Sequence, residues 1–149
     1  MINYKYHTEE VPQNMRITQV SGILLTKDKQ VMIYQEKNGS YRIPGGHPEK
    51  NEDLEETLKR EVLEELNVTI KSISYLGYQE VIGDTKDSYA QVRMLATITS
   101  IGKEKTDPAE NEIYKRHLIN LENLNDYLNW GSVGEEMTHH ALNKVNEIR

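Results

Sequence analysis

The sequence contains no cysteine and no long apolar run. Without cysteine the chain forms neither a disulfide nor a thiolate metal site, which fits a reducing cytoplasm. No apolar run approaches the roughly 20 residues that a membrane helix needs, and residues 1–11 are too polar for a secretory signal. Internal repeats, low-complexity tracts and linkers are also absent. We therefore expect a cytoplasmic protein with no membrane partner.

An excess of positive charge is also missing, since the formal net charge is −6 at pH 7. Such a chain is poorly suited to bind long nucleic acid without sequence preference. A small phosphorylated substrate is still compatible with this charge, because a metal ion can supply positive charge locally. The length of 149 residues predicts one domain, residues 1–149, with a proper core. We expect a monomer or a homodimer.

The clearest local pattern is a helix over residues 54–66. Asp53 is a good N-cap, and Glu56 three residues later completes a capping box. The segment between Leu54 and Leu66 contains neither glycine nor proline and is rich in strong helix formers. Asn67 suits a left-handed C-terminal cap, and the β-branched residues that follow indicate a strand.

A helical wheel at about 100° per residue separates the side chains of this helix into two groups. The apolar stripe consists of Leu54, Leu58, Val62 and Leu66. The adjacent acidic arc consists of Glu61, Glu64 and Glu65. Because Glu65 projects between Leu54 and Leu58, its carboxylate is predicted to be partly desolvated, which is costly without a compensating cation.

These carboxylates allow two interpretations. Converging negative charges repel one another, and a hard divalent cation would remove the conflict; oxygen ligands suit Mg²⁺ or Mn²⁺. The alternative is a solvated acidic surface helix, which is common in proteins. The overlap of Glu65 with the leucine stripe counts against that alternative.

The wider spacing supports the metal interpretation. Gly46 is followed after five residues by Glu52, and after seven more by the run Arg60-Glu61-Val62-Leu63-Glu64-Glu65. Val68 is the closing aliphatic residue, and residues 41–44 form an aromatic-x-aliphatic-Pro lead-in. This pattern resembles the Nudix box of the Nudix hydrolases, the MutT-like family. Asn67 stands where the family has glycine, and asparagine tolerates a left-handed helix cap.

The resemblance implies a fold, an activity and roles for individual residues. The fold would be α+β, an α/β/α sandwich with a central mixed sheet and the acidic box helix. The activity would be hydrolysis of a pyrophosphate bond in a nucleoside diphosphate linked to a further group, by water attack at phosphorus. Mg²⁺ or Mn²⁺ would be held by the Gly45 carbonyl and the box carboxylates Glu61, Glu64 and Glu65, with Glu64 essential for turnover. Gly46 and an ion pair between Glu52 and Arg60 would support the box.

Residues outside the box are less strongly indicated. The family often adds a carboxylate from a later loop, and aligning residues 118–121 with a family segment favours Glu112 over Glu110 as the catalytic group. The alternative is a charged loop tip. Arg16, Tyr41 and Arg42 are candidates for substrate binding, although strand tyrosines more commonly pack in a core.

The rest of the chain is predominantly β-structure with a helical end. Alternation of apolar residues and turn signals predict strands at 16–26, 31–36, 41–43, 68–82, 89–101 and 113–119. Residues 1–14 are predicted to form an arm or a short edge strand. A short helix should begin after Asn120, and a last helix after Ser132 or Gly134. The predicted core-facing stripe of that last helix consists of Met137, Ala141, Leu142, Val145 and Ile148.

Three functional hypotheses follow. The leading one is a divalent-metal-dependent pyrophosphohydrolase acting on a small nucleotide, with a nucleoside triphosphate favoured. The second is a non-catalytic nucleotide-binding or regulatory module of the same fold, and the three intact glutamates count against it. The third is an interaction protein that presents a solvated acidic helix.

Overall fold

A mixed eight-stranded β-sheet forms the centre of the computed structural model, which describes residues 1–85, 87–108 and 110–147. The strands are β1 (Asn3–His7), β2 (Arg16–Leu25), β3 (Gln30–Gln35), β4 (Tyr41–Arg42), β5 (Gly45–Gly46), β6 (Val68–Ile82), β7 (Ser88–Ile101) and β8 (Lys115–Asn120). Their order is β1-β6-β7-β2-β3-β4, with β5 paired to β2 and β8 to β3. β2 and β7 run parallel, whereas the other pairs are antiparallel.

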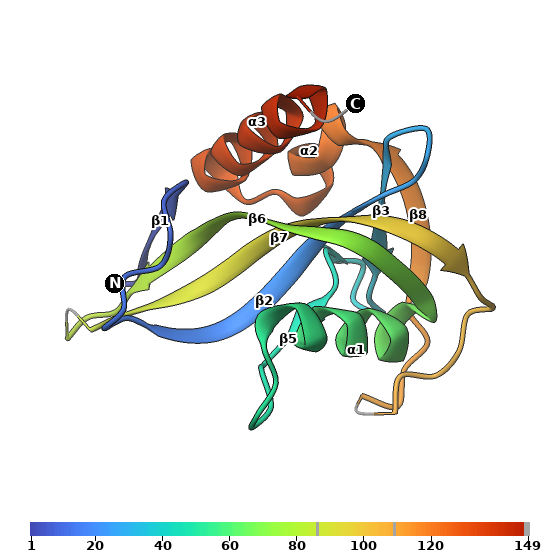
Figure 1. The fold of residues 1–149 in the computed structure, drawn as a ribbon, viewed down its shortest axis with the longest axis horizontal. Coiled ribbons are helices and arrows are strands. Elements are labelled where there is room, and N and C mark those ends of the chain that lie inside the picture. The colour runs from blue at the N-terminus through green and yellow to red at the C-terminus, as the bar shows by residue number, and fades with distance from the viewer. Residues whose placement is uncertain (86, 109, 148–149) are drawn as a thin grey trace.

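Helices cover both faces of this sheet. They are α1 (Leu54–Leu66), the 3₁₀ turn η1 (Leu121–Asn123), α2 (Leu124–Leu128) and α3 (Gly131–Glu147). α1 lies on one side of the sheet, and α2 and α3 lie on the other (Figure 1). The predicted α/β/α arrangement is therefore confirmed. No helix within the described ranges is both long enough and apolar enough to cross a membrane.

Strand alternation builds a separate core on each face. In β3, Val31 and Ile33 belong to the cluster beneath α3, whereas Met32 and Tyr34 belong to the cluster beneath α1. This follows from the period of two in a strand, where successive side chains point to opposite faces. Both cores are contributed largely by β-branched and leucine side chains, so neither face of the central strands is exposed to water.

The ends of α1 agree closely with the sequence prediction. The Asp53 carboxylate accepts a hydrogen bond from the Glu56 N–H (2.8 Å), and Glu56 accepts one from the Asp53 N–H (3.1 Å). Asn67 is left-handed, with φ 54° and ψ 49°. Its side-chain Nδ2 also donates to the Lys103 carbonyl at 3.0 Å, a contact that a glycine would lack.

Other boundaries differ slightly from the predicted ones. The last helix begins at Gly131, before either predicted residue, and Asn125 contacts its start by donating to the Gly131 carbonyl at 3.1 Å. Asn120 lies at the N-cap position of η1 but makes no capping hydrogen bond through its side chain. β8 begins two residues later than predicted, at Lys115. Ile148, predicted to extend the apolar stripe of the last helix, lies outside the described residues.

Candidate active site

The glycine pair brings the backbone into close contact with β2 and with α1. β5 pairs with β2 so that Gly45 lies opposite Ser21 and Gly46 opposite Val20. A Cβ atom at Gly45 would lie 2.2 Å from the Val20 carbonyl oxygen, and one at Gly46 would lie 2.4 Å from Cδ of Glu61. Side chains at these positions would therefore separate the loop from its neighbours.

Arg60 ties this loop to the helix. Its Nε and Nη2 donate to the two carboxylate oxygens of Glu52 at 2.6 and 3.0 Å, so the ion pair that the family resemblance implies is bidentate. Nη2 also donates to the His47 carbonyl at 3.3 Å, and Thr57 donates to Glu52 at 2.9 Å. The hydrogen bonds from Arg60 are the main reason that the pKa of Glu52 falls to about 2.

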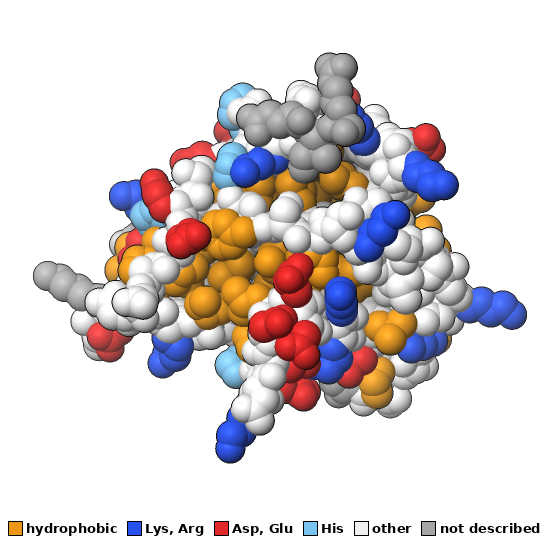
Figure 2. All heavy atoms as spheres, viewed as in Figure 1, with side chains coloured by type: hydrophobic (Ala, Val, Ile, Leu, Met, Phe, Trp, Pro, Cys, Tyr) orange, Lys and Arg blue, Asp and Glu red, His pale blue; other side chains and the backbone are white. Residues whose placement is uncertain are grey.

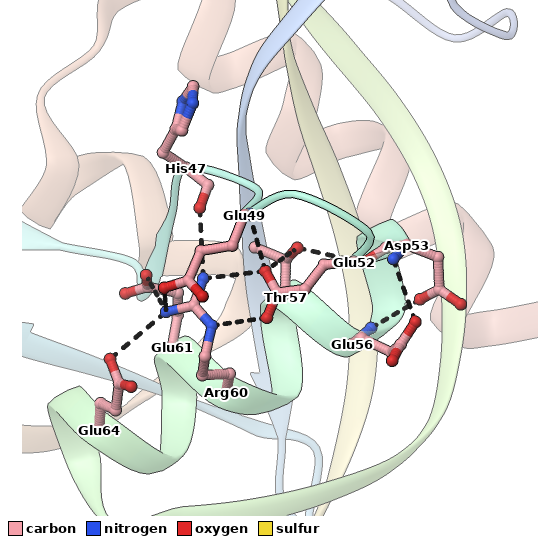
Figure 3. Close-up of polar contacts among 9 residues, drawn as sticks. All are labelled: His47, Glu49, Glu52, Asp53, Glu56, Thr57, Arg60, Glu61 and Glu64. Atoms are coloured by element: carbon pink, nitrogen blue, oxygen red, sulfur yellow. Dashed lines mark hydrogen bonds and ion pairs between the residues drawn. The ribbon is translucent and has the colours of Figure 1, made fainter.

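The same guanidinium faces two box carboxylates. Nη1 of Arg60 lies 2.8 Å from Glu61 and 3.4 Å from Glu64 (Figure 3). Glu61 is mostly shielded from water, whereas the Glu64 side chain is 35% exposed. Burial raises the pKa of Glu61, and the ion pair with Arg60 opposes that shift. Arg60 is thus the cation that balances this part of the acidic arc in the protein alone.

Glu65 is buried, as its position on the helical wheel predicts. Its side chain is 8% exposed and accepts hydrogen bonds from the Gly45 N–H at 3.0 Å and from the Tyr34 hydroxyl at 3.3 Å. Burial is the main reason that its pKa rises to about 8, and the negative charges of Glu61 and Asp107 raise it further. The hydrogen bond from Gly45 opposes the shift but does not cancel it.

Asp107 is a candidate that the sequence interpretation missed. It lies between β7 and β8, is 3% exposed, and pairs with Glu112 in an isolated bridge. Its charge raises the pKa of both Glu61 and Glu65, so it faces the acidic arc. Glu112, the predicted catalytic residue of this loop, is half-buried, and its carboxylate accepts a hydrogen bond from the Lys37 N–H at 2.9 Å.

The donor chemistry of the site fits a hard divalent cation. Within the described residues, no three acidic or histidine side chains are already gathered into a metal cluster. The available groups are nevertheless carboxylates, one of them buried against like charges, and a cation would offset that repulsion. Figure 2 shows Asp and Glu side chains in a band on the face that carries α1. Gly45 contacts Glu65 through its N–H, and its carbonyl remains a predicted ligand.

A cavity of about 510 Å³ lies next to the box. Gly45 and Tyr34, which both donate to Glu65, contribute to its wall. Polar side chains of the central sheet contribute to its lining, namely Gln19, Ser21, Gln79, Gln91 and Arg93. The sequence signal for this patch is weak, because it consists of alternate polar positions on strands that are otherwise apolar.

The three predicted substrate-binding residues do not lie together. Arg42 lines the cavity and forms an ion pair with Glu36. Tyr41 packs edge-on against Tyr127, with ring centroids 5.1 Å apart. Arg16 lies over the ring of Tyr89 at 5.5 Å, where β2 begins. Their binding roles remain predictions, and the position of Arg42 is the one that supports such a role.

Comparison with known proteins gives one family and several relatives. The profile of the NUDIX domain matches residues 15–140. The NAD-capped RNA hydrolase NudC of Vibrio cholerae is 24% identical over 123 residues, which cover 80% of this chain and 44% of NudC. The putative 8-oxo-dGTP diphosphatase YtkD of Bacillus subtilis is 38% identical over 55 residues, which cover 37% of this chain and 35% of YtkD. The chain thus spans less than half the length of these curated relatives.

The fold resembles that of a solved structure. A mutant of the Bacillus subtilis pyrophosphohydrolase BsRppH superposes with a TM-score of 0.73 at 22% identity, covering 95% of this chain and 90% of that one. The domain profile covers most of the chain, and the glycine loop, the Arg60–Glu52 pair and the acidic helix lie within the matched residues. This chain belongs to the NUDIX domain family, as the box motif predicts.

Proposed function

We propose that this protein is a divalent-metal-dependent pyrophosphohydrolase that cleaves a small nucleoside diphosphate-X substrate, with a nucleoside triphosphate favoured. One observation carries the proposal beyond family membership. Glu65 is a buried carboxylate that faces the charges of Glu61 and Asp107, an arrangement that costs stability in the protein alone. Such a cost is retained where the charges are needed to hold a cation.

Each acidic side chain has a proposed role. Glu61, Glu64 and Glu65, with the Gly45 carbonyl, would hold Mg²⁺ or Mn²⁺. The bound cation would polarise the phosphate oxygens and stabilise charge as the phosphorus is attacked by water. Glu64 has the most exposed side chain of these three glutamates, so it can reach both solvent and substrate.

Other residues would neutralise charge or bind and release protons around the box. Arg60 anchors the loop through Glu52 and holds Glu61 and Glu64 while no cation is bound. Glu65 retains its proton near neutral pH, because burial raises its pKa to about 8. Binding of a cation would therefore be coupled to release of that proton. Glu112 and Asp107 are the two proposed sources of a general base from the later loop.

The relatives suggest which substrates to test. Their names refer to NAD-capped RNA, to 8-oxo-dGTP and to a pyrophosphohydrolase. A formal net charge of −6 favours a small nucleotide over a long RNA for this chain. The panel should therefore contain nucleoside triphosphates, nucleotide sugars, ADP-ribose, dinucleoside polyphosphates and NAD-capped RNA.

The test measures release of phosphate and pyrophosphate with Mg²⁺, with Mn²⁺ and with chelator. Glu64→Gln should reduce turnover on the order of a thousandfold while the protein stays folded. Glu55→Gln is the matched control, because Glu55 is exposed in the first turn of the same helix. Turnover near the wild-type rate in Glu64→Gln would refute the assignment. If no substrate of the panel releases phosphate or pyrophosphate while the protein still binds metal, the alternative of a non-catalytic nucleotide-binding module would be favoured.

A further inference from the structure

A buried cation, Arg93, lines the cavity beside the box and has no acidic partner among the residues that the structure describes. Arg93 on β7 is 3% exposed, and burial lowers its pKa to about 10. Its guanidinium donates to Ser21 Oγ at 3.2 Å and to Oε1 of Gln19 and Gln91, each at 3.3 Å. All three acceptors are neutral. Among the described residues its Nε has no hydrogen-bond partner.

This guanidinium determines how the neighbouring amides are oriented. A guanidinium only donates hydrogen bonds, so the carbonyl oxygens of Gln19 and Gln91 must face Arg93. Their NH₂ groups are then left to face a ligand. Gln79 donates from Nε2 to the same oxygen of Gln91 at 3.1 Å, which leaves its own carbonyl oxygen as an acceptor.

The lining therefore offers more donors than acceptors. The donors are the NH₂ groups of Gln19 and Gln91, and the acceptor is the carbonyl oxygen of Gln79. The buried positive charge adds to the same preference. A complementary ligand presents two adjacent acceptors, a carbonyl oxygen beside a ring nitrogen, together with an N–H group.

The size and position of the cavity suit a nucleobase. Its volume is about 510 Å³, and Trp130 contributes an aromatic wall. The Trp130 ring centroid lies 5.0 Å from the Arg93 guanidinium carbon, so the ring packs against the charged group. Gly45 and Tyr34 connect the cavity to Glu65, which places a bound base next to the proposed reaction site.

Among the common bases, the 6-oxopurines match this lining. Guanine presents O6 and N7 as adjacent acceptors and N1–H as a donor. Adenine and cytosine replace the carbonyl with an amino donor, which would face the donors of Gln19 and Gln91. Uracil and thymine carry carbonyls but are smaller than a purine.

We propose that the cavity around Arg93 selects a 6-oxopurine nucleotide, guanine or hypoxanthine, over adenine and cytosine nucleotides. This inference rests on the proposed function for the identity of the ligand as a nucleotide. Arg93 acts through its buried positive charge and by orienting the amides of Gln19 and Gln91.

Nucleoside monophosphates allow a test that is independent of turnover, because they contain no pyrophosphate bond. Trp130 is the only tryptophan of the sequence and lines the cavity, so its fluorescence reports binding there. In chelator, GMP and IMP should each bind the full-length protein at least tenfold more tightly than AMP or CMP. Equal affinities for GMP and AMP would overturn the proposal.

Two variants test the role of the guanidinium. Arg93→Met should remove most of the preference for GMP over AMP, and its melting temperature would be measured in parallel. Gln91→Glu keeps the side-chain size, gives Arg93 an acidic partner, and replaces a donor with an acceptor. It should weaken GMP binding at least tenfold and leave AMP binding within about threefold. Gln13→Glu adds the same charge in an exposed loop and should change neither affinity.

Each remaining outcome is decisive. An unchanged preference in both Arg93→Met and Gln91→Glu would refute the assignment. Inorganic phosphate that competes as well as GMP would show an anion site instead of a base site. Base-selective binding in a protein that hydrolyses nothing would support the pocket and refute the proposed hydrolysis, so the two proposals can fail separately.

Discussion

Replacing Glu65 with glutamine should make the metal-free protein more stable while abolishing its proposed activity. The glutamine oxygen can still accept the hydrogen bond from the Gly45 N–H, and the Tyr34 hydroxyl can turn to accept from the new NH₂ group. What disappears at a pH above about 8 is a buried negative charge that faces Glu61 and Asp107. The prediction thus opposes stability to function at one residue.

The direction and size of the effect follow from the pKa. The folded protein holds the Glu65 proton up to a pH of about 8, whereas a glutamate in the unfolded chain releases it near 4.5. Stability is therefore full below pH 4.5 and falls as the pH rises through 8. At 1.36 kcal/mol per pKa unit the loss has an upper limit of about 5 kcal/mol. Water entry and relaxation reduce this, and we expect about 2 kcal/mol.

Thermal unfolding in chelator between pH 5 and 9 measures the effect. For a chain of this size about 2 kcal/mol corresponds to roughly 4–8 °C. The melting temperature of Glu65→Gln should equal that of the wild type at pH 5 and exceed it at pH 8.5. The melting temperature of Glu55→Gln should equal that of the wild type at every pH. Added Mg²⁺ should narrow the gap, because it binds the folded wild type more tightly. A difference that does not change with pH, or a less stable Glu65→Gln at pH 8.5, would refute the reasoning.

Two further predictions concern backbone positions. Gly45→Ala should cost about 3 kcal/mol, because its Cβ would overlap the Val20 carbonyl, whereas Gly83→Ala meets an ordinary contact and should be mild; urea unfolding compares them. Asn67→Gly should change stability by less than about 1 kcal/mol, since the lost bond to Lys103 is offset by an easier left-handed cap. Asn67→Ala also loses the bond to Lys103, and alanine tolerates the left-handed cap less well than glycine, so this variant should lose about 2 kcal/mol of stability. Equal melting temperatures for Asn67→Gly and Asn67→Ala would contradict this account.

The box helix could be predicted because its signals are local. The capping box at Asp53 and Glu56, the left-handed Asn67 and the burial of Glu65 all follow from spacing within a few turns of one helix. The bidentate contact between Arg60 and Glu52 was accessible through the motif. In each case the partners are close in sequence, so the backbone geometry of the helix and its loop leaves few arrangements.

The remaining features depend on contacts between distant segments. Asp107 was missed because it is buried where the chain forms a bridge with Glu112, whereas its sequence context is a charged loop. The cavity was missed because its lining comes from β2, β6 and β7, whose order is not encoded in any one strand. In the sequence Arg93 is a single polar position in a mostly apolar strand. Only the strand order β6-β7-β2 places Gln19 and Gln79 on the same face of the sheet as Arg93.

The arrangement of these strands has a consequence for how such a protein can change over evolutionary time. The acidic residues of the box come from one continuous helix, whereas the proposed base-reading side chains come from three strands of the sheet. Substitutions at Gln79 or Gln91 can therefore alter the choice of base without moving a carboxylate. Ser21 is different, because it lies opposite Gly45 and also accepts a hydrogen bond from Arg93. A substitution of Ser21 would therefore disturb both the glycine loop and Arg93. We expect changes in base specificity to arise at Gln79 or Gln91 and to leave Ser21 unchanged.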